Sequence, residues 1–148
     1  MPDIAIVAAK RTVFGRFLGK LSSLSAVDLA CAAGTAVLGG LDRSHIDQVI
    51  IGNVLAAGQG MNIARNISLL AGVPLTAAAA TFNRFCASGL ESINNAALRI
   101  MTGNGEVFIA GGVESMSVSG AVVSMVQVYE AGVGSVLPNE SMALTSKV

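Results

Sequence analysis

The stretch "TFNRFCASGLESINNAALRI", residues 81–100, passes from a strand-like segment into a helical one, with a cysteine at the junction. The preceding strand is predicted within Ala77–Phe82, and its alanines suggest close packing against helices or another subunit. The helix is predicted from about Ser88 to Met101, and Gly103 closes it. One helical stripe is formed by Leu90, Ile93, Asn94, Ala97, Leu98 and Met101.

Toward the N-terminus, the pattern predicts a further strand and helix. Ile4–Ala9 is typical of a short buried strand, and a glycine-punctuated loop, "RTVFGRFLGKLSS", follows it. Ser25 and Asp28 have the spacing of a capping box, and Gly39–Gly40 is a helix end. The helix between them is predicted to place several small or apolar residues on one face, namely Val27, Ala30, Cys31, Gly34 and Leu38.

The rest of the chain continues the alternation of strand and helix. A second strand is predicted around Gln48–Ile51, and a short helix within residues 60–72 ends at Gly72-Val73-Pro74. A fourth strand is predicted in "EVFIAGG", residues 106–112. The order βαβαβαβ over residues 4–112 predicts an α/β fold with a parallel or mixed sheet and helices on both faces. A composition of 53% hydrophobic and 12% charged residues suits strands buried on both faces.

Bulk charge and hydropathy argue against several functional classes. The net charge of zero gives no indication of nucleic-acid binding, and we find no secretory signal or membrane span. Cys31 and Cys86 are therefore expected as reduced thiols in a cytoplasm-like compartment, with Cys31 a small core residue. A locally basic segment is either a solvated loop or a contact for an anionic ligand: Lys10, Arg11, Arg16 and Lys20.

Cys86 follows the third strand, where ligand sites of such sheets lie, beyond the carboxyl ends of the strands. The N-terminus of a helix stabilises a thiolate through its free N–H groups and its partial positive charge. Ala87, Ser88 and Gly89 keep the approach open, and backbone N–H groups there can bind an oxyanion. The pattern leaves two interpretations: a nucleophile that forms an acyl-cysteine, or a small helix-cap residue.

Together, Asn83, Cys86, Ala87, Ser88 and Gly89 match the Asn-x-x-Cys-(Ala/Gly/Ser)-Ser-Gly nucleophile motif of thiolases. Three more segments resemble this family in order and spacing: "IAIVAAKRTVFGRFLGKLSSLSAVDLA", "IDQVIIGNVLAAGQGMNIARNISLLAGVP" and "AGGVESMS". The resemblance covers roughly residues 3–117. We therefore expect a thiolase N-terminal-like domain over residues 1–117 and a divergent tail over 118–148, whose run Val122–Tyr129 could add a strand.

The resemblance implies an acyltransferase of fatty-acid and lipid metabolism. Cys86 would accept the acyl group of a coenzyme A thioester, Asn83 would brace the loop, and Ser88 and Gly89 would shape the turn whose N–H groups serve the oxyanion. Residues 111–116 would lie near the site or a subunit contact. No metal or redox cofactor is implied. Expected partners are acyl-CoA or CoA, and either a homo-oligomer or a chain supplying the missing C-terminal half.

The second half of a thiolase supplies a Gly-His-Pro histidine and a Cys-x-Gly-x-Gly cysteine, and neither motif occurs in these 148 residues. His45, in "DRSHIDQ" before the second strand, is expected as a surface or turn residue. The chain alone is thus expected to turn over slowly or not at all. The alternative is a non-catalytic thiolase half that acts as an interaction module. We expect a cytoplasmic location, with mitochondria or peroxisomes the family's other compartments.

Overall fold

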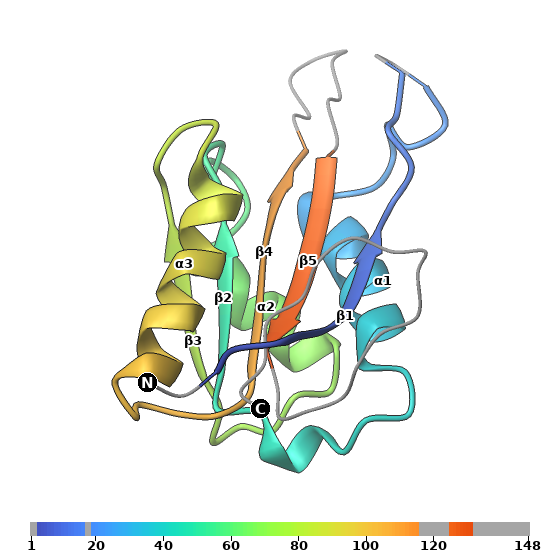
Figure 1. Ribbon diagram of the computed structural model, residues 1–148. Coiled ribbons are helices and arrows are strands. Elements are labelled where there is room, and N and C mark those ends of the chain that lie inside the picture. The colour runs from blue at the N-terminus through green and yellow to red at the C-terminus, as the bar shows by residue number, and fades with distance from the viewer. Residues whose placement is uncertain (1–2, 17–18, 116–124, 132–148) are drawn as a thin grey trace.

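The computed structural model describes residues 3–16, 19–115 and 125–131, the last as backbone only, and shows one five-stranded sheet between helices (Figure 1). The strands lie in the order β1-β5-β4-β2-β3. Their bounds are β1 Ile6–Arg11, β2 Gln48–Gly52, β3 Ala78–Phe82, β4 Phe108–Glu114 and β5 Met125–Ala131. The helices are α1 Ala26–Leu38, α2 Ile63–Leu70 and α3 Ser88–Met101, with a short 3-10 helix, η1, at Arg43–His45.

The sheet is mixed, as the sequence predicts. β2 is parallel to both β3 and β4, whereas β5 is antiparallel to β4 and to β1. It follows that β1, β2, β3 and β4 all run the same way, and Figure 1 shows them rising together while β5 descends. Their carboxyl ends form one edge of the sheet, which we call the carboxyl edge.

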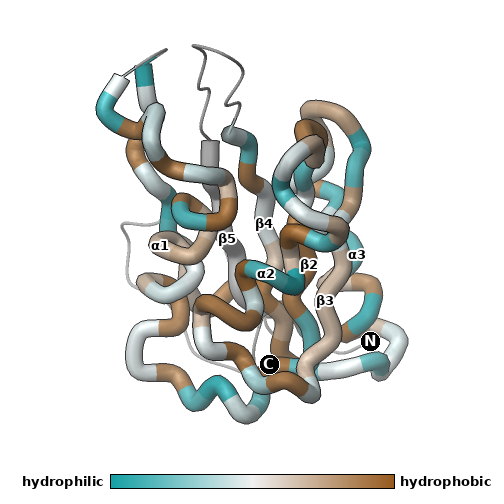
Figure 2. The backbone as a smooth tube through the Cα atoms, turned by 180° about the vertical axis from the view of Figure 1, so that it is seen from behind, coloured by the Kyte–Doolittle hydropathy of each residue, from teal (hydrophilic) through white to brown (hydrophobic). Residues whose placement is uncertain are grey.

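Helices cover both faces of the sheet, which confirms the predicted α/β architecture. On one face, Val49 and Ile51 of β2 pack against α1 and α2. On the other face, Ile50 packs with Ala96 and Ile100 of α3. Figure 2 shows α1 and α2 on the same side of the sheet. Because successive side chains of a strand point to opposite faces, covering both faces buries all of β2 and explains its unbroken apolar run.

The capping box at the start of α1 is confirmed. The Ser25 hydroxyl accepts the Asp28 N–H at 3.1 Å, and the Asp28 carboxylate accepts the Ser25 N–H at 2.9 Å. The buried face of α1 lies slightly to one side of the predicted one, so Val27 and Cys31 are only half-buried at its margin. The fully buried residues of α1 are Ala26, Leu29, Ala30, Ala33, Gly34, Val37 and Leu38.

The expectation of a buried first strand is wrong. β1 begins two residues later than predicted and is an edge strand of the sheet, and its residues are half-buried or exposed. β4 also begins two residues later than the predicted range 106–112. The N–H groups of Glu106 and Val107 donate to the Asp47 carboxylate and therefore do not take part in strand pairing. The second and third strands and α3 lie where the sequence places them.

The segment after Ser115 contributes a strand to the interior of the sheet. The predicted run Val122–Tyr129 overlaps β5, which pairs with β4 on one side and β1 on the other. This strand joins β1 to the remainder of the sheet. The domain boundary at residue 117 stays a prediction, and the part of the tail after Ala131 lies outside the described residues.

Most of the predicted apolar stripe of α3 does not pack against the sheet; Ile93, half-buried against the cluster of Ile50 and Phe108, is the exception. Leu90 and Leu98 are 61% and 57% exposed. The buried face is instead Ser88, Ser92, Ala96 and Ile100, one residue in every four. Small residues occupy this face because the first turns of α3 approach the strands too closely for larger side chains, so the hydrophobic stripe points away.

Three glycines set that close approach. Gly52 at the end of β2 is the register partner of Gly112 on β4, and the first turn of α3 lies over both. A Cβ on Gly52 would lie 2.3 Å from the Ser88 carbonyl carbon and 2.6 Å from the Gly89 nitrogen. A Cβ on Gly112 would lie 3.0 Å from the Gly89 Cα. Backbone therefore packs on backbone here, and Cys86 is held at the carboxyl edge.

We expect Gly52→Ala to destabilise the protein by about 1–3 kcal/mol, because its methyl group would push the start of α3 off the sheet. Urea unfolding measures this. Gly34→Ala is the matched control, since a Cβ there meets nothing within 4 Å and alanine favours the helix by up to about 1 kcal/mol. Equal stability of Gly52→Ala and the unsubstituted chain would contradict this packing.

Candidate functional site

Cys86 lies in the loop between β3 and α3, at the carboxyl edge of the sheet. Its thiol is free and its side chain is exposed. Within the described part of the chain, no hydrogen bond involves the Cys86 sulfur. The cysteine is thus accessible from solvent at the edge where the sequence places a ligand site.

The loop before Cys86 is fixed by Asn83 and by an unusual backbone conformation. The Asn83 side-chain oxygen accepts the Phe85 N–H at 3.1 Å, as in an Asx turn. Phe85 has a φ of 49°, the left-handed region, which costs an ordinary residue roughly 1–2 kcal/mol. The Phe85 ring is 79% exposed, so packing of the ring does not impose this conformation. The sharp turn thus brings the next residue, Cys86, to the surface.

The Ser88 side chain stabilises the same turn through two hydrogen bonds. Its hydroxyl accepts the Arg84 N–H at 2.8 Å and donates to the Phe85 carbonyl at 2.6 Å, and its side chain is buried. The N–H groups of Ala87 and Ser88 donate to the carbonyls of Arg84 and Phe85. Ala87 and Ser88 therefore hold the loop, and neither offers a free N–H to a ligand.

Other N–H groups at this turn have no acceptor among the described residues. They include those of Cys86 and of Gly89 and Leu90, the second and third residues of α3. Ala87 caps the helix without a side-chain hydrogen bond, so the positive end of the helix faces the loop. Of the predicted loop residues, Ala87 and Ser88 use their N–H groups within the turn, whereas Gly89 keeps its N–H available, as does Cys86.

An ion pair beside the cysteine escaped the sequence analysis. The Arg84 guanidinium contacts the carboxylate of Glu91, which lies in the first turn of α3. The Asn95 amide nitrogen donates to the other Glu91 oxygen at 3.1 Å. The sequence did contain a signal for this pair. Glu91 is an acidic residue in the first turn of the helix, where negative charge stabilises the helix start, and the cation Arg84 precedes it.

Residues at the ends of β2 and β4 form a second support that sequence reasoning missed. Glu114 accepts the N–H groups of Val54 and Leu55, and the buried Asn53 amide donates to the Val113 carbonyl at 2.8 Å. These bonds join the loop after β2 to the end of β4. Of residues 111–116, predicted near the site or a subunit contact, Gly112 lies against the start of α3, whereas Met116 is outside the described residues.

The chain's other cysteine and its histidine lie away from Cys86. Cys31 packs at the margin of the core, its sulfur 3.9 Å from the Ile67 carbonyl oxygen. Burial, and secondarily the charge of Asp28, raises the pKa of the Cys31 thiol and keeps it protonated. His45 is exposed in η1, before β2 and so at the opposite edge, 3.5 Å from the Asp42 carboxylate. The prediction of a surface histidine is confirmed.

The described residues contain no group of three or more His, Cys, Asp or Glu side chains placed to hold a metal ion. Among the helices that the structure describes, none has the length and hydropathy needed to cross a membrane.

We expect Ser88→Ala to destabilise the protein by about 1–2 kcal/mol, because the Arg84 N–H and the Phe85 carbonyl would lose their buried partner. Urea unfolding gives the stability, and hydrogen exchange at the Arg84 amide, expected to become faster, localises the effect. Ser23→Ala is the control, since Ser23 is exposed. Unchanged exchange at Arg84 would show that Ser88 does not hold the turn.

Known proteins resemble this chain in both sequence and fold. Residues 4–144 match the thiolase N-terminal domain. The chain is 43% identical over 121 residues to an acetyl-CoA acetyltransferase of Pseudomonas aeruginosa, covering 80% of this chain and 31% of that protein. It is 44% identical over 119 residues to the cytosolic acetyl-CoA acetyltransferase of Gibberella zeae, covering 79% of this chain and 30% of the relative.

The fold likeness agrees with the sequence match. The crystal structure of the Acat5 thiolase from Ascaris suum, in complex with coenzyme A, superposes with a TM-score of 0.76 at 39% identity, over 78% of this chain and 31% of that one. The chain thus spans slightly less than a third of the length of these relatives. With a family match over residues 4–144 and a shared fold, the chain belongs to the thiolase family, of which it carries the N-terminal domain.

Proposed function

We propose that this chain carries the acyl-accepting cysteine of an acyltransferase that moves acyl groups between coenzyme A thioesters. The observation that carries the proposal is the exposed Cys86 thiol at the start of α3, next to the free N–H groups of Cys86 and Gly89. The Ascaris suum relative, solved in complex with coenzyme A, supports the choice of substrate class.

The proposed step begins with attack of the Cys86 thiolate on the thioester carbonyl carbon. The carbonyl oxygen gains negative charge, which the N–H groups of Cys86 and Gly89 are placed to stabilise together with the helix dipole. The carbon–sulfur bond to coenzyme A then breaks, and coenzyme A leaves as its thiolate while the acyl group stays on Cys86. A second thioester or free coenzyme A takes the acyl group away. The step as proposed uses no metal or redox cofactor.

Complete turnover is proposed to require the other half of a thiolase, from a longer polypeptide or from a partner chain. The histidine and second cysteine of that half would supply proton transfer, since the described residues place His45 at the far edge and Cys31 in the core margin. Leu90 and Leu98 are exposed on α3, which supports the proposal that further protein covers this face of the helix. β3 is the other edge strand, and the exposed Leu70 at the end of α2 and Leu75 just before β3 support self-association there.

The second candidate function is a non-catalytic interaction module. It is favoured by the exposed stripe of α3 and by the lack, among the described side chains, of any base in contact with the Cys86 sulfur. We also propose a cytoplasmic location, which the cytosolic Gibberella zeae relative supports, and a role in fatty-acid or lipid metabolism.

We expect incubation with acetyl-CoA to place one acetyl group on Cys86, detected by intact mass and peptide mapping. Cys86→Ala should abolish the adduct, because the half-buried Cys31 thiol is kept protonated and hindered. Cys31→Ala, the matched control, should retain it. Acetylation of Cys86 no faster than that of a free cysteine would refute the enzymatic proposal and favour the interaction module. Turnover measured with and without an added C-terminal half of a thiolase then shows whether this chain needs that half for activity.

A further inference from the structure

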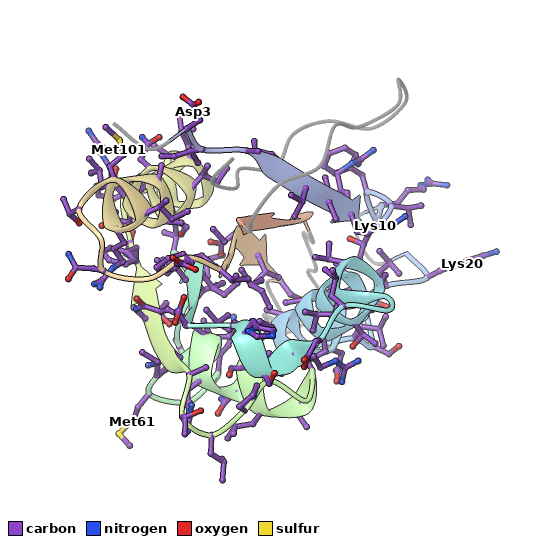
Figure 3. All side chains as sticks on the ribbon, turned by 60° about the horizontal axis from the view of Figure 1, so that its bottom comes forward. Asp3, Lys10, Lys20, Met61 and Met101 are labelled. Carbon is purple, nitrogen blue, oxygen red and sulfur yellow. The ribbon has the colours of Figure 1, made fainter. Side chains whose placement is uncertain are left out.

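The turn between α3 and β4 contains an asparagine followed by a glycine, Asn104-Gly105. No other asparagine in the sequence precedes a glycine. Figure 3 shows Met101, the last residue of α3, at the outside of the molecule, and the turn that follows it is exposed at Asn104. This end of α3 lies at the edge of the sheet opposite to Cys86, because β4 starts there. We call residues 102–105 the Asn-Gly turn.

The structure requires glycine at position 105. Gly105 has a φ of 128°, which a residue with a side chain rarely adopts. A Cβ built there would lie 2.7 Å from the ring of Phe108 and 3.1 Å from the Cβ of Asp47. The Asp47 carboxylate is itself fixed, because it accepts two N–H groups of the chain that follows the turn. Asn104 is therefore necessarily followed by a residue that has no side chain to shield its N–H.

The N–H group of Gly105 is also not engaged. Among the described residues it has no hydrogen-bond acceptor. Two other described asparagines are exposed, Asn83 and Asn94, and both differ in this respect. The N–H after Asn83 donates to the Ser88 hydroxyl at 2.8 Å, and the N–H after Asn94 belongs to the hydrogen-bond ladder of α3. Of these three exposed asparagines, Asn104 alone is followed by an N–H that has no acceptor among the described residues.

The main chain of Asn104 is fixed, whereas its side chain is open to water. Its N–H donates to the Arg99 carbonyl at 2.8 Å, which closes α3. Its amide nitrogen donates to the Thr102 hydroxyl at 2.8 Å, but both residues are exposed, so water competes for this bond. The side-chain oxygen has no donor among the described residues. The side-chain carbonyl carbon is therefore accessible to the nitrogen of the next residue.

We propose that Asn104 is a site of spontaneous deamidation, which gives the end of α3 a negative charge as the protein ages. The Gly105 nitrogen loses its proton to solvent and attacks the side-chain carbonyl carbon of Asn104. A new carbon–nitrogen bond forms, and the bond from that carbon to the side-chain nitrogen breaks. This nitrogen takes up a proton and leaves as ammonia. Water then opens the resulting succinimide at either carbonyl, which gives aspartate or isoaspartate at position 104.

Both products disturb the end of α3. Aspartate places a negative charge at the C-terminal end of the helix, where the helix dipole disfavours it. Isoaspartate adds a methylene group to the main chain between two anchors, the Arg99 carbonyl before it and the Asp47 carboxylate after it. The inference is independent of the proposed function, because Cys86 lies beyond the other end of α3.

Incubation at mildly alkaline pH followed by tryptic peptide mapping tests the proposal, since cleavage after Arg84 and Arg99 separates the three asparagines. Position 104 should gain about one dalton and give two chromatographic forms, and faster at higher pH because the attacking nitrogen must lose its proton. Asn83 and Asn94 are internal controls and should react at least about fivefold more slowly, since the N–H after each must first give up a hydrogen bond. Equal rates at the three positions, or no gain at position 104, would overturn the inference.

Two variants make the test specific. Asn104→Gln keeps the amide but would have to close a larger, six-membered ring, so the mass gain at this position should be lost. Asn104→Asp reproduces the aspartate product directly. The aged chain and Asn104→Asp should unfold at a lower urea concentration than the fresh chain, whereas ageing should leave the unfolding of Asn104→Gln unchanged. A mass gain retained in Asn104→Gln would overturn the assigned site, and unchanged unfolding of the deamidated chain would overturn its effect on α3.

Discussion

The packing of backbone on backbone at Gly52, Gly89 and Gly112 is the constraint on which the rest of the structure depends. Because no Cβ separates them, the first turn of α3 lies directly on the ends of β2 and β4. The positive end of the helix is thereby fixed at the carboxyl edge, and the turn before it is forced to the surface. Ser88 follows from the same contact, since only a small polar side chain fits beneath the turn and satisfies the Arg84 N–H.

The two cysteines occupy different surroundings, one at the margin of the core and the other on the surface. Cys31 lies on α1 against the core, where burial and Asp28 disfavour its thiolate. Cys86 lies where the chain leaves the sheet; it is exposed, and the N–H groups of Cys86 and Gly89 have no acceptor among the described residues. The same side chain is therefore half-buried at one position and open to solvent at the other.

Much of the fold could be predicted from local pattern. The alternation of strand and helix, the capping box at Ser25 and the bounds of α3 depend on short-range periodicity and turn chemistry, which the sequence displays directly. The face on which α3 packs could not, because the apolar stripe with Leu90 and Leu98 suggests one side and the glycines of two distant strands require the other. Likewise, Glu114 and Asn53 support the site through partners about 60 residues away in sequence.

By itself, then, the sequence determined the element order, the position of Cys86 at a strand–helix junction and the family motif around it, because each is written in neighbouring residues. Only the tertiary structure decided that β5 lies inside the sheet between β1 and β4. It also decided which N–H groups of the turn donate to other residues of the loop, and that Glu114 at the end of β4 holds the loop after β2. These features depend on strand order and on contacts between distant segments, which local periodicity does not encode.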